Sequence, residues 1–210
     1  MPRKKTLRSK VTEKMFEAEK SRPSDAIELL KTDHKEATAL FKKFFKARTA
    51  AQKKELVGEI CLALSIHMRI EEEIFYPAVK QALGKDDKEL VPEARVEHSS
   101  LKNLITDVEA AEPDEEFDAR VQVMCEYTNH HVKEEETEMF PKVRDTDLDL
   151  EVLCQKLLER KLALMDSIAS KASGRAKPPR PSSLFKGRGA RAGARSGSSR
   201  STGRTSHARH

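Results

Sequence analysis

Apolar side chains recur every three or four residues between positions 24 and 169, which is the period of an amphipathic α-helix. Four long helices joined by short turns favour an antiparallel up-down bundle, to which a shorter fifth helix is added. The pattern places these helices at about residues 25–46, 51–81, 92–110, 114–144 and 148–169, with Pro77 kinking or ending the second one.

The composition supports an all-α fold class. Aromatic residues make up only 5% of the chain and Trp is absent, which argues against a β-sandwich or barrel. No stretch approaches the ~20 apolar residues of a membrane span, and the basic first residues lack the apolar core of a secretory signal. The cysteines are too few and too scattered for a disulfide framework, which favours a reducing, cytoplasmic location: Cys61, Cys125 and Cys154.

Charge divides the chain into an acidic body and two basic ends. Residues 1–24 hold eight bases and three acids, and residues 171–210 hold eleven bases and no acid. Of the 40 bases and 35 acids in the whole chain, 21 bases and 32 acids are therefore left for residues 25–170, a net charge of −11. An acidic body is not expected of a general nucleic-acid-binding domain.

These patterns predict four segments. They are a basic N-terminal arm (1–23), the four-helix bundle (24–145), an additional helix (146–169) and a basic tail (170–210). The tail consists mostly of Gly, Ser, Arg, Ala, Pro and Lys, so we expect it to be disordered. Either it makes weak contacts with nucleic acid or another polyanion, or it only keeps the chain soluble.

Six ionisable residues interrupt the apolar stripes, where charged groups are not expected. They comprise two His/Glu pairs at i,i+4 spacing and one further His in each half of the chain. A shift of 64 residues maps the first set onto the second, and each half has 33 residues between its two histidines. This is an internal duplication of a helical hairpin, and the six residues are His34, His67, Glu71, His98, His131 and Glu135.

Four imidazoles and two carboxylates form a ligand set for iron, manganese or zinc. The number of ligands suits two metal ions, each held by two histidines, with the carboxylates able to bridge them. Cations would also compensate carboxylates enclosed at the low-dielectric centre of a bundle. For any single histidine, a hydrogen-bonded core residue would be the simpler interpretation, but the duplicated pairs favour metal.

The fourth helix offers two registers of the same motif. His130 is followed by Glu134 with the same spacing as His131 by Glu135. The repeat aligns His131 with His67, so we choose His131 and Glu135, and we expect His130 to be partly exposed. Asp33 and Glu97, each next to a histidine, either accept a hydrogen bond from the second ring nitrogen of a ligand or are solvated surface acids, and we prefer the second interpretation. We assign Glu72 and Glu136 to a charged outer face.

The two half-motifs resemble those of the hemerythrin-like family, also called the HHE cation-binding domain. The resemblance rests on His34 with His67-x-x-x-Glu71 and Phe75-Tyr76-Pro77, repeated as His98 with His131-x-x-x-Glu135 and Phe140-Pro141. It implies a four-helix bundle around two non-haem irons joined by an oxo or hydroxo bridge. It also implies that the four histidines are terminal iron ligands and that Glu71 and Glu135 bridge the irons.

One departure from the family pattern bears on activity. The oxygen-carrying hemerythrins have a fifth histidine where this chain has Ala94. One iron would thus have an open position, which favours chemistry with peroxide, nitric oxide or oxygen over reversible oxygen carriage. Tyr127, one turn before His131, either reaches the site as a weak ligand or hydrogen-bond partner, or packs in the bundle.

Three functions follow from these features. The first is a di-iron protein that binds or reacts with a small oxidant (oxygen, peroxide or nitric oxide), so that a peroxide-decomposing enzyme is one form of it. The second is an iron-binding or iron-buffering protein without turnover. The third is a metal-dependent sensor whose basic tail docks on nucleic acid or an acidic partner. The sequence leaves the oligomeric state open.

Overall fold

The computed structural model describes residues 23–84, 87, 89–112 and 114–172, and every long regular element in these ranges is a helix. The predicted all-α class is confirmed. Nearly all of the basic N-terminal arm and of the basic tail lies outside the described residues. The elements are α2 (Ala26–Lys46), α3 (Ala50–Ile70), η1 (Glu71–Phe75), α4 (Tyr76–Ala82), α5 (Leu90–Ala110), α6 (Glu115–Glu134), η3 (Glu135–Met139), α7 (Phe140–Arg144) and α8 (Leu150–Ala172).

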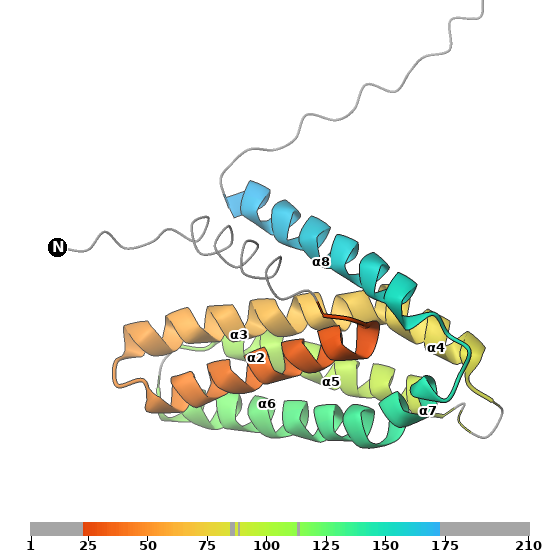
Figure 1. The fold of residues 1–210 in the computed structure, drawn as a ribbon. Helices are drawn as coiled ribbons and strands as arrows, with labels where there is room; N and C mark the ends of the chain where they lie inside the picture. Colours follow the sequence, from red (N-terminus) through yellow and green to blue (C-terminus); the bar gives the residue numbers. More distant parts are fainter. Residues whose placement is uncertain (1–22, 85–86, 88, 113, 173–210) are drawn as a thin grey trace, which may run out of the picture. The chain divides into compact units, whose positions relative to one another are not determined.

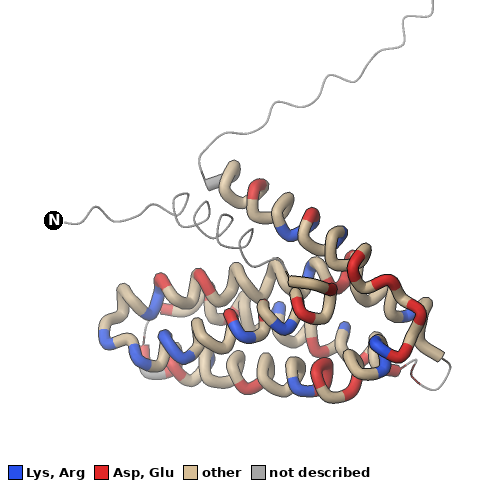
Figure 2. Tube along the Cα trace, viewed as in Figure 1, with Lys and Arg blue, Asp and Glu red and all other residues tan. Residues whose placement is uncertain are grey.

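Helices α2, α3, α5 and α6 form an antiparallel bundle (Figure 1). Each contacts two others in a closed ring, in which α2 meets α3, α3 meets α5, α5 meets α6, and α6 meets α2. The two duplicated hairpins are therefore packed face to face. Lys, Arg, Asp and Glu are spread along all four helices, as Figure 2 shows, while the residues of the apolar stripes are buried.

Local sequence explains where the helices begin. The Asp25 carboxylate accepts a hydrogen bond from the Glu28 backbone N–H at 2.9 Å, which caps α2. Thr49 caps α3 through the N–H of Gln52, and Asp114 caps α6 through the N–H of Phe117. Each cap satisfies a backbone donor that the first helical turn leaves without an intrahelical partner.

The second and fourth predicted helices are each interrupted by a π-helical turn. In η1 the backbone N–H of Tyr76 bonds to the carbonyl of Glu71, five residues back, and in η3 Phe140 bonds to Glu135 in the same way. Pro77 and Pro141 follow directly, in the first turns of α4 and α7. Because proline has no N–H to donate, a change of hydrogen-bond register is accommodated at these points.

Two clusters of buried apolar residues form the core. One fills the end of the bundle that holds the N-terminal half of α2, and it includes Leu30, Phe75 and Phe140. The other fills the opposite end around Phe44 and Phe117. Along α2 and α5, His34 and His98 stand between residues of the first cluster and residues of the second. The buried polar groups therefore lie at a level with apolar packing on both sides.

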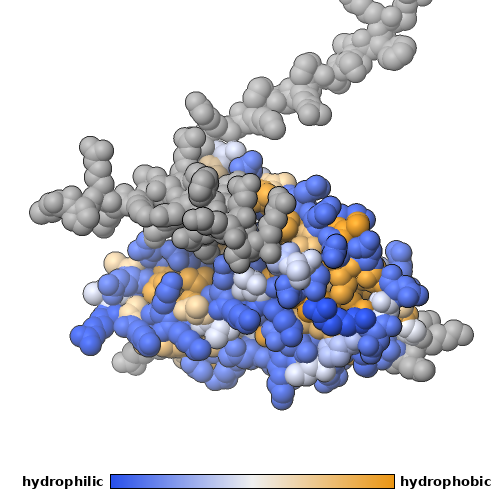
Figure 3. All heavy atoms as spheres, viewed as in Figure 1, coloured by the Kyte–Doolittle hydropathy of each residue, from blue (hydrophilic) through white to orange (hydrophobic). Residues whose placement is uncertain are grey.

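Helix α8 packs on α2, α3 and η1 and adds Leu153, Leu157 and Leu164 to the first apolar cluster. In Figure 1 this helix lies over the first hairpin, which α2 and α3 form. In Figure 3, apolar surface remains visible on the side where α8 begins. Among the described helices, none has the length and apolar character of a membrane-spanning segment.

Candidate metal centre

The structure brings all six residues of the duplicated motif together inside the bundle. Each is between 0% and 6% exposed, although each carries an ionisable side chain. His34 and His98 come from α2 and α5, His67 and His131 from the last turns of α3 and α6, and the carboxylates of Glu71 and Glu135 from the first residues of the two π turns. His130, the alternative in the second register, is 62% exposed.

The donor atoms of the first hairpin surround one point. The Nε2 atoms of His34 and His67 are 3.1 Å apart. His34 Nε2 lies 3.3 Å from Glu135 Oε2, and His67 Nε2 lies 3.3 Å from Glu71 Oε1. Ligands that share an ion bound at ~2.1 Å are roughly 3.0 to 3.4 Å from one another, so these spacings fit a common cation.

A second group repeats this arrangement in the other hairpin. The Nε2 atoms of His98 and His131 are 3.0 Å apart. His98 Nε2 lies 3.4 Å from Glu71 Oε2, and His131 Nε2 lies 3.7 Å from Glu135 Oε2. The two oxygens of Glu71 thus face different histidine pairs, and Glu135 Oε2 lies near a histidine of each pair. Both carboxylates therefore lie between the two histidine pairs.

The outer nitrogen of every histidine faces another carboxylate. Glu136 lies 2.9 Å from Nδ1 of His34, Glu72 3.1 Å from that of His98, and Glu97 2.8 Å from that of His131. Asp33 Oδ2 is 3.5 Å from Nδ1 of His67. Our interpretation of these four acids as solvated surface groups is therefore wrong, because each reaches a histidine of a different helix.

These contacts fix the tautomer of the histidines. A carboxylate only accepts hydrogen bonds, so the Nδ1 atoms of His34, His98 and His131 carry the hydrogen and donate it. Their Nε2 lone pairs then point inward, as a metal ligand requires. The 64-residue shift maps Asp33 onto Glu97 and Glu72 onto Glu136, but it does not indicate which histidine each acid faces.

Tyr76 is a residue of the site that the sequence analysis did not select. It is fully buried, its hydroxyl donates to Glu135 Oε1 at 2.8 Å, and its oxygen is 3.1 Å from Nε2 of His98. Its counterpart in the repeat is Phe140, whose ring stacks on His34 with 5.9 Å between the centroids. Tyr127, which we considered for such a role, is instead 44% exposed on α6.

The chemistry of the inner groups fits a cation. Neither oxygen of Glu71 accepts a hydrogen bond, and the same is true of Glu135 Oε2, although all three atoms are buried. Buried carboxylate oxygens without partners are costly in a protein interior. Two inward lone pairs only 3.1 Å apart, such as those of His34 and His67, also repel each other unless a positive charge lies between them.

The close packing of these buried groups also shifts their pKa values in the metal-free protein. Burial lowers the pKa of His67 to about 4. For His34, burial opposes protonation, but the adjoining carboxylate of Glu135, the charge of Glu71 and the hydrogen bond to Glu136 outweigh it and raise the pKa to about 9. Burial and the neighbouring Glu135 charge raise the pKa of Glu71 well above its usual range.

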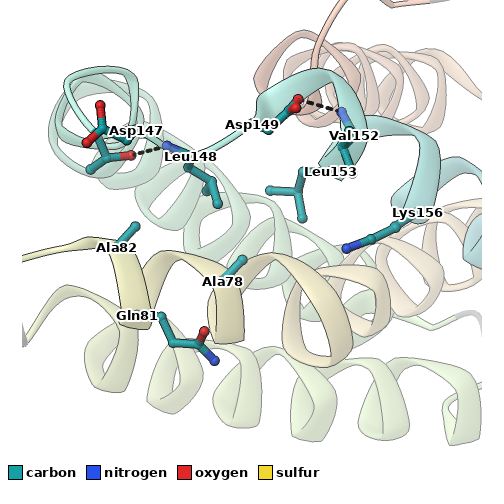
Figure 4. Close-up of a pocket in the computed structure, with 10 residues that line it drawn as sticks. Ala78, Gln81, Ala82, Asp147, Leu148, Asp149, Val152, Leu153 and Lys156 are labelled. Carbon is teal, nitrogen blue, oxygen red and sulfur yellow. Dashed lines mark hydrogen bonds between the residues drawn. The ribbon is translucent and has the colours of Figure 1, made fainter.

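A surface pocket of about 550 Å³ lies between α4 and the start of α8 (Figure 4). Its wall is formed by Ala78, Ala82, Leu148, Val152 and Leu153, with Lys156 at one side. None of the six inner residues lines it. The pocket is therefore separate from the cluster of histidines and carboxylates.

Comparisons with known proteins agree with this geometry. A family model described as the hemerythrin HHE cation-binding domain matches residues 25–143. A protein named DNA nickase from Nostoc sp. strain PCC 7120 is 29% identical over 119 residues, which are 56% of this chain and 33% of that protein. This chain thus spans about one third of the length of that relative.

A solved structure shares the fold. It is that of a hemerythrin HHE cation-binding domain-containing protein of Mycobacterium kansasii, with a TM-score of 0.62 and 23% identity. The match covers 72% of this chain and 94% of the other. At this identity the likeness supports the helical architecture described above.

Metal binding at pH 7 should release protons. In the metal-free protein His34 is protonated at pH 7, because its pKa is about 9. His34 must lose this proton to act as a ligand, so we expect release of about one proton per chain from this residue. Calorimetric titration with metal in buffers of different ionisation enthalpy measures this number. The His34→Gln variant should release one proton fewer, and equal release by both proteins would contradict the assignment.

Proposed function

This chain belongs to the hemerythrin HHE cation-binding domain family, and we propose that it is a non-haem di-iron protein that reacts with a small oxidant, with peroxide as the favoured substrate. Cation binding is the property of the family. The number of ions, their identity as iron and the reaction with oxidant are our proposals. The observation that carries them is the pair of adjoining histidine groups that share Glu71, with Glu135 next to a histidine of each.

The ligand set supports two iron ions. Two imidazoles for each ion with shared carboxylates, and no thiolate among the six, suit iron, and manganese and zinc are the other metals that such ligands accept. When bound, iron supplies the one-electron chemistry that reduction or disproportionation of a small oxidant needs. His34 and His67 would hold one ion and His98 and His131 the other.

The residues around the ions differ between the two halves. Tyr76 presents a hydroxyl to the side of His98, where it donates to Glu135 and can hold or pass a proton. On the side of His34, Phe140 presents only an apolar ring. Ala94 is buried and has no group that could bind a metal. We therefore propose that oxidant is bound on the Tyr76 side, where a ligand position is open.

Iron loading and peroxide turnover are tested together. Protein from iron-supplied cells should contain two irons per chain and evolve oxygen from hydrogen peroxide. Glu71→Gln removes the carboxylate that faces both histidine pairs, and we expect iron affinity to fall at least about tenfold and oxygen evolution to be lost. Glu126→Gln, an exposed carboxylate of α6, is the matched control and should behave as the parent.

The outcomes separate two functions. Two irons without oxygen evolution would favour an iron-binding or iron-buffering protein without turnover. A chain that holds no iron, or holds as much in Glu71→Gln as in the parent, would contradict the di-iron proposal itself.

The hydroxyl of Tyr76 is tested by Tyr76→Phe. This change gives both halves of the site a phenylalanine, because Phe140 already occupies the equivalent position. We expect iron content to stay at two per chain, while the rate of peroxide decomposition falls by about ten- to a hundredfold. Tyr127→Phe removes a hydroxyl from an exposed tyrosine and should leave both quantities unchanged. An unaltered rate in Tyr76→Phe would remove the hydroxyl from the reaction.

A sensor that docks on nucleic acid is the second candidate. It is favoured by the eleven bases and absence of acids in residues 171–210, a segment almost wholly outside the described residues, and by the DNA nickase among the relatives. A chain ending at residue 172 keeps α8 and removes ten of these bases. We expect the full chain to bind duplex DNA at low salt and the shortened chain to lose this binding. Absence of binding by the full chain would contradict the docking function.

A further inference from the structure

The carboxylates that orient the four histidines are themselves paired with cations, and one of the four differs from the rest. Lys161 pairs with Asp33. Lys102 lies 2.6 Å from Glu72, and Lys31 lies 3.8 Å from Glu136. Three of the carboxylates therefore have a permanent ammonium beside them, since the lysine side chain is charged at neutral pH.

The fourth carboxylate, Glu97, has a different neighbourhood. Its Oε2 accepts the hydrogen bond from His131, while its Oε1 lies 3.5 Å from Nε2 of His130. His130 Nε2 is also 3.1 Å from Glu134 Oε1. In place of a lysine, this position thus has an imidazole and a second carboxylate.

Comparison with the first hairpin explains why solvent reaches the side chains around Glu97. In the first hairpin the residues equivalent to His130 and Glu134 are Ile66 and Ile70, which are 4% and 0% exposed in the apolar cluster that includes α8. That same helix delivers Lys161 to Asp33. In the second hairpin His130 is 62% exposed and Glu134 33% exposed, so solvent and ions reach them. At equivalent places in the repeat, the first hairpin thus has the ammonium group of Lys161 from α8, and the second hairpin has side chains that can bind a metal.

The metal-binding atoms of Glu97, His130 and Glu134 lie within the same distance of one another as those of the buried centre. One atom from each of Glu97, His130 and Glu134 lies within 4.8 Å of the others. The spacings of 3.5 Å and 3.1 Å from the imidazole nitrogen are those of ligands on one ion bound at ~2.1 Å. One imidazole and two carboxylates suit zinc, manganese or iron(II), with water completing the coordination.

We propose that Glu97, His130 and Glu134 form a third, solvent-accessible site for a divalent metal cation, joined to the buried centre through the shared carboxylate of Glu97. One oxygen of Glu97 binds the surface cation and the other holds Nδ1 of His131. The site takes the place that lysine ammonium groups have at the other three histidines. It does not depend on any reaction of the buried centre with an oxidant.

Zinc is the probe for this site. Iron-loaded full-length protein is dialysed against a series of micromolar zinc concentrations, and the iron and zinc in each sample are measured together. We expect one zinc per chain to be added while the iron is retained. Glu134→Gln and His130→Gln should each weaken zinc binding at least about tenfold without loss of iron.

The control is Glu126→Gln, which removes the same charge from an exposed position on the same helix and should bind zinc as the parent does. Equal zinc binding by parent, Glu134→Gln and His130→Gln would overturn the proposal, and so would zinc uptake matched by iron loss, which would place the zinc in the buried centre. If the chain holds no iron, the proposed function fails on its own, and the comparison of Glu134→Gln with Glu126→Gln still decides the surface site.

Discussion

Six ionisable side chains enclosed by a helical bundle carry an electrostatic cost, and that cost explains what surrounds them. Glu71 and Glu135 are buried with oxygens that accept no hydrogen bond, and pairs of imidazole nitrogens approach to about 3 Å. In a protein interior such an arrangement is stable only if positive charge is present among the donors. Cation binding is thus built into the packing, because the metal-free protein must instead hold a proton on His34, and burial beside Glu135 raises the pKa of Glu71.

The electrostatic cost of the buried groups also explains which charged side chains surround the histidines. Each histidine that turns Nε2 toward the centre faces a carboxylate at Nδ1, which fixes its ring and makes it a stronger ligand. Those carboxylates would in turn be partly buried charges, and lysines from three different helices lie beside three of them: Lys31, Lys102 and Lys161. Helix α8 therefore has an electrostatic role as well as a packing role, since Lys161 reaches Asp33, which faces His67.

Periodicity and internal repetition were sufficient to predict the helices, the bundle and the six residues that meet at its centre, because these depend on spacing within single helices. The partners of the histidines could not be found this way. Asp33 does not serve the adjacent His34 but a histidine on the next helix, and only the packing of α2 on α3 brings them together. Tyr76 was missed for a different reason. In a regular α-helix, a residue five positions after Glu71 lies about 140° away round the axis, whereas the π turn places both on the inner face.

The π turns also account for how two equivalent halves acquire different chemistry. Each turn is followed by the residue that packs directly beside the histidines, which is Tyr76 in one half and Phe140 in the other. A hydroxyl that donates to Glu135 and lies beside His98 gives one pair of histidines a proton donor, while the phenyl ring stacked on His34 offers the other pair no polar group. The surfaces of the two halves differ as well. Helix α8 covers the half that holds His34, whereas His130 and Glu134 of the other half are in contact with solvent. The proton-donating tyrosine and the solvent-accessible carboxylates therefore both belong to the His98–His131 half, whereas the His34–His67 half is enclosed by Phe140 and α8.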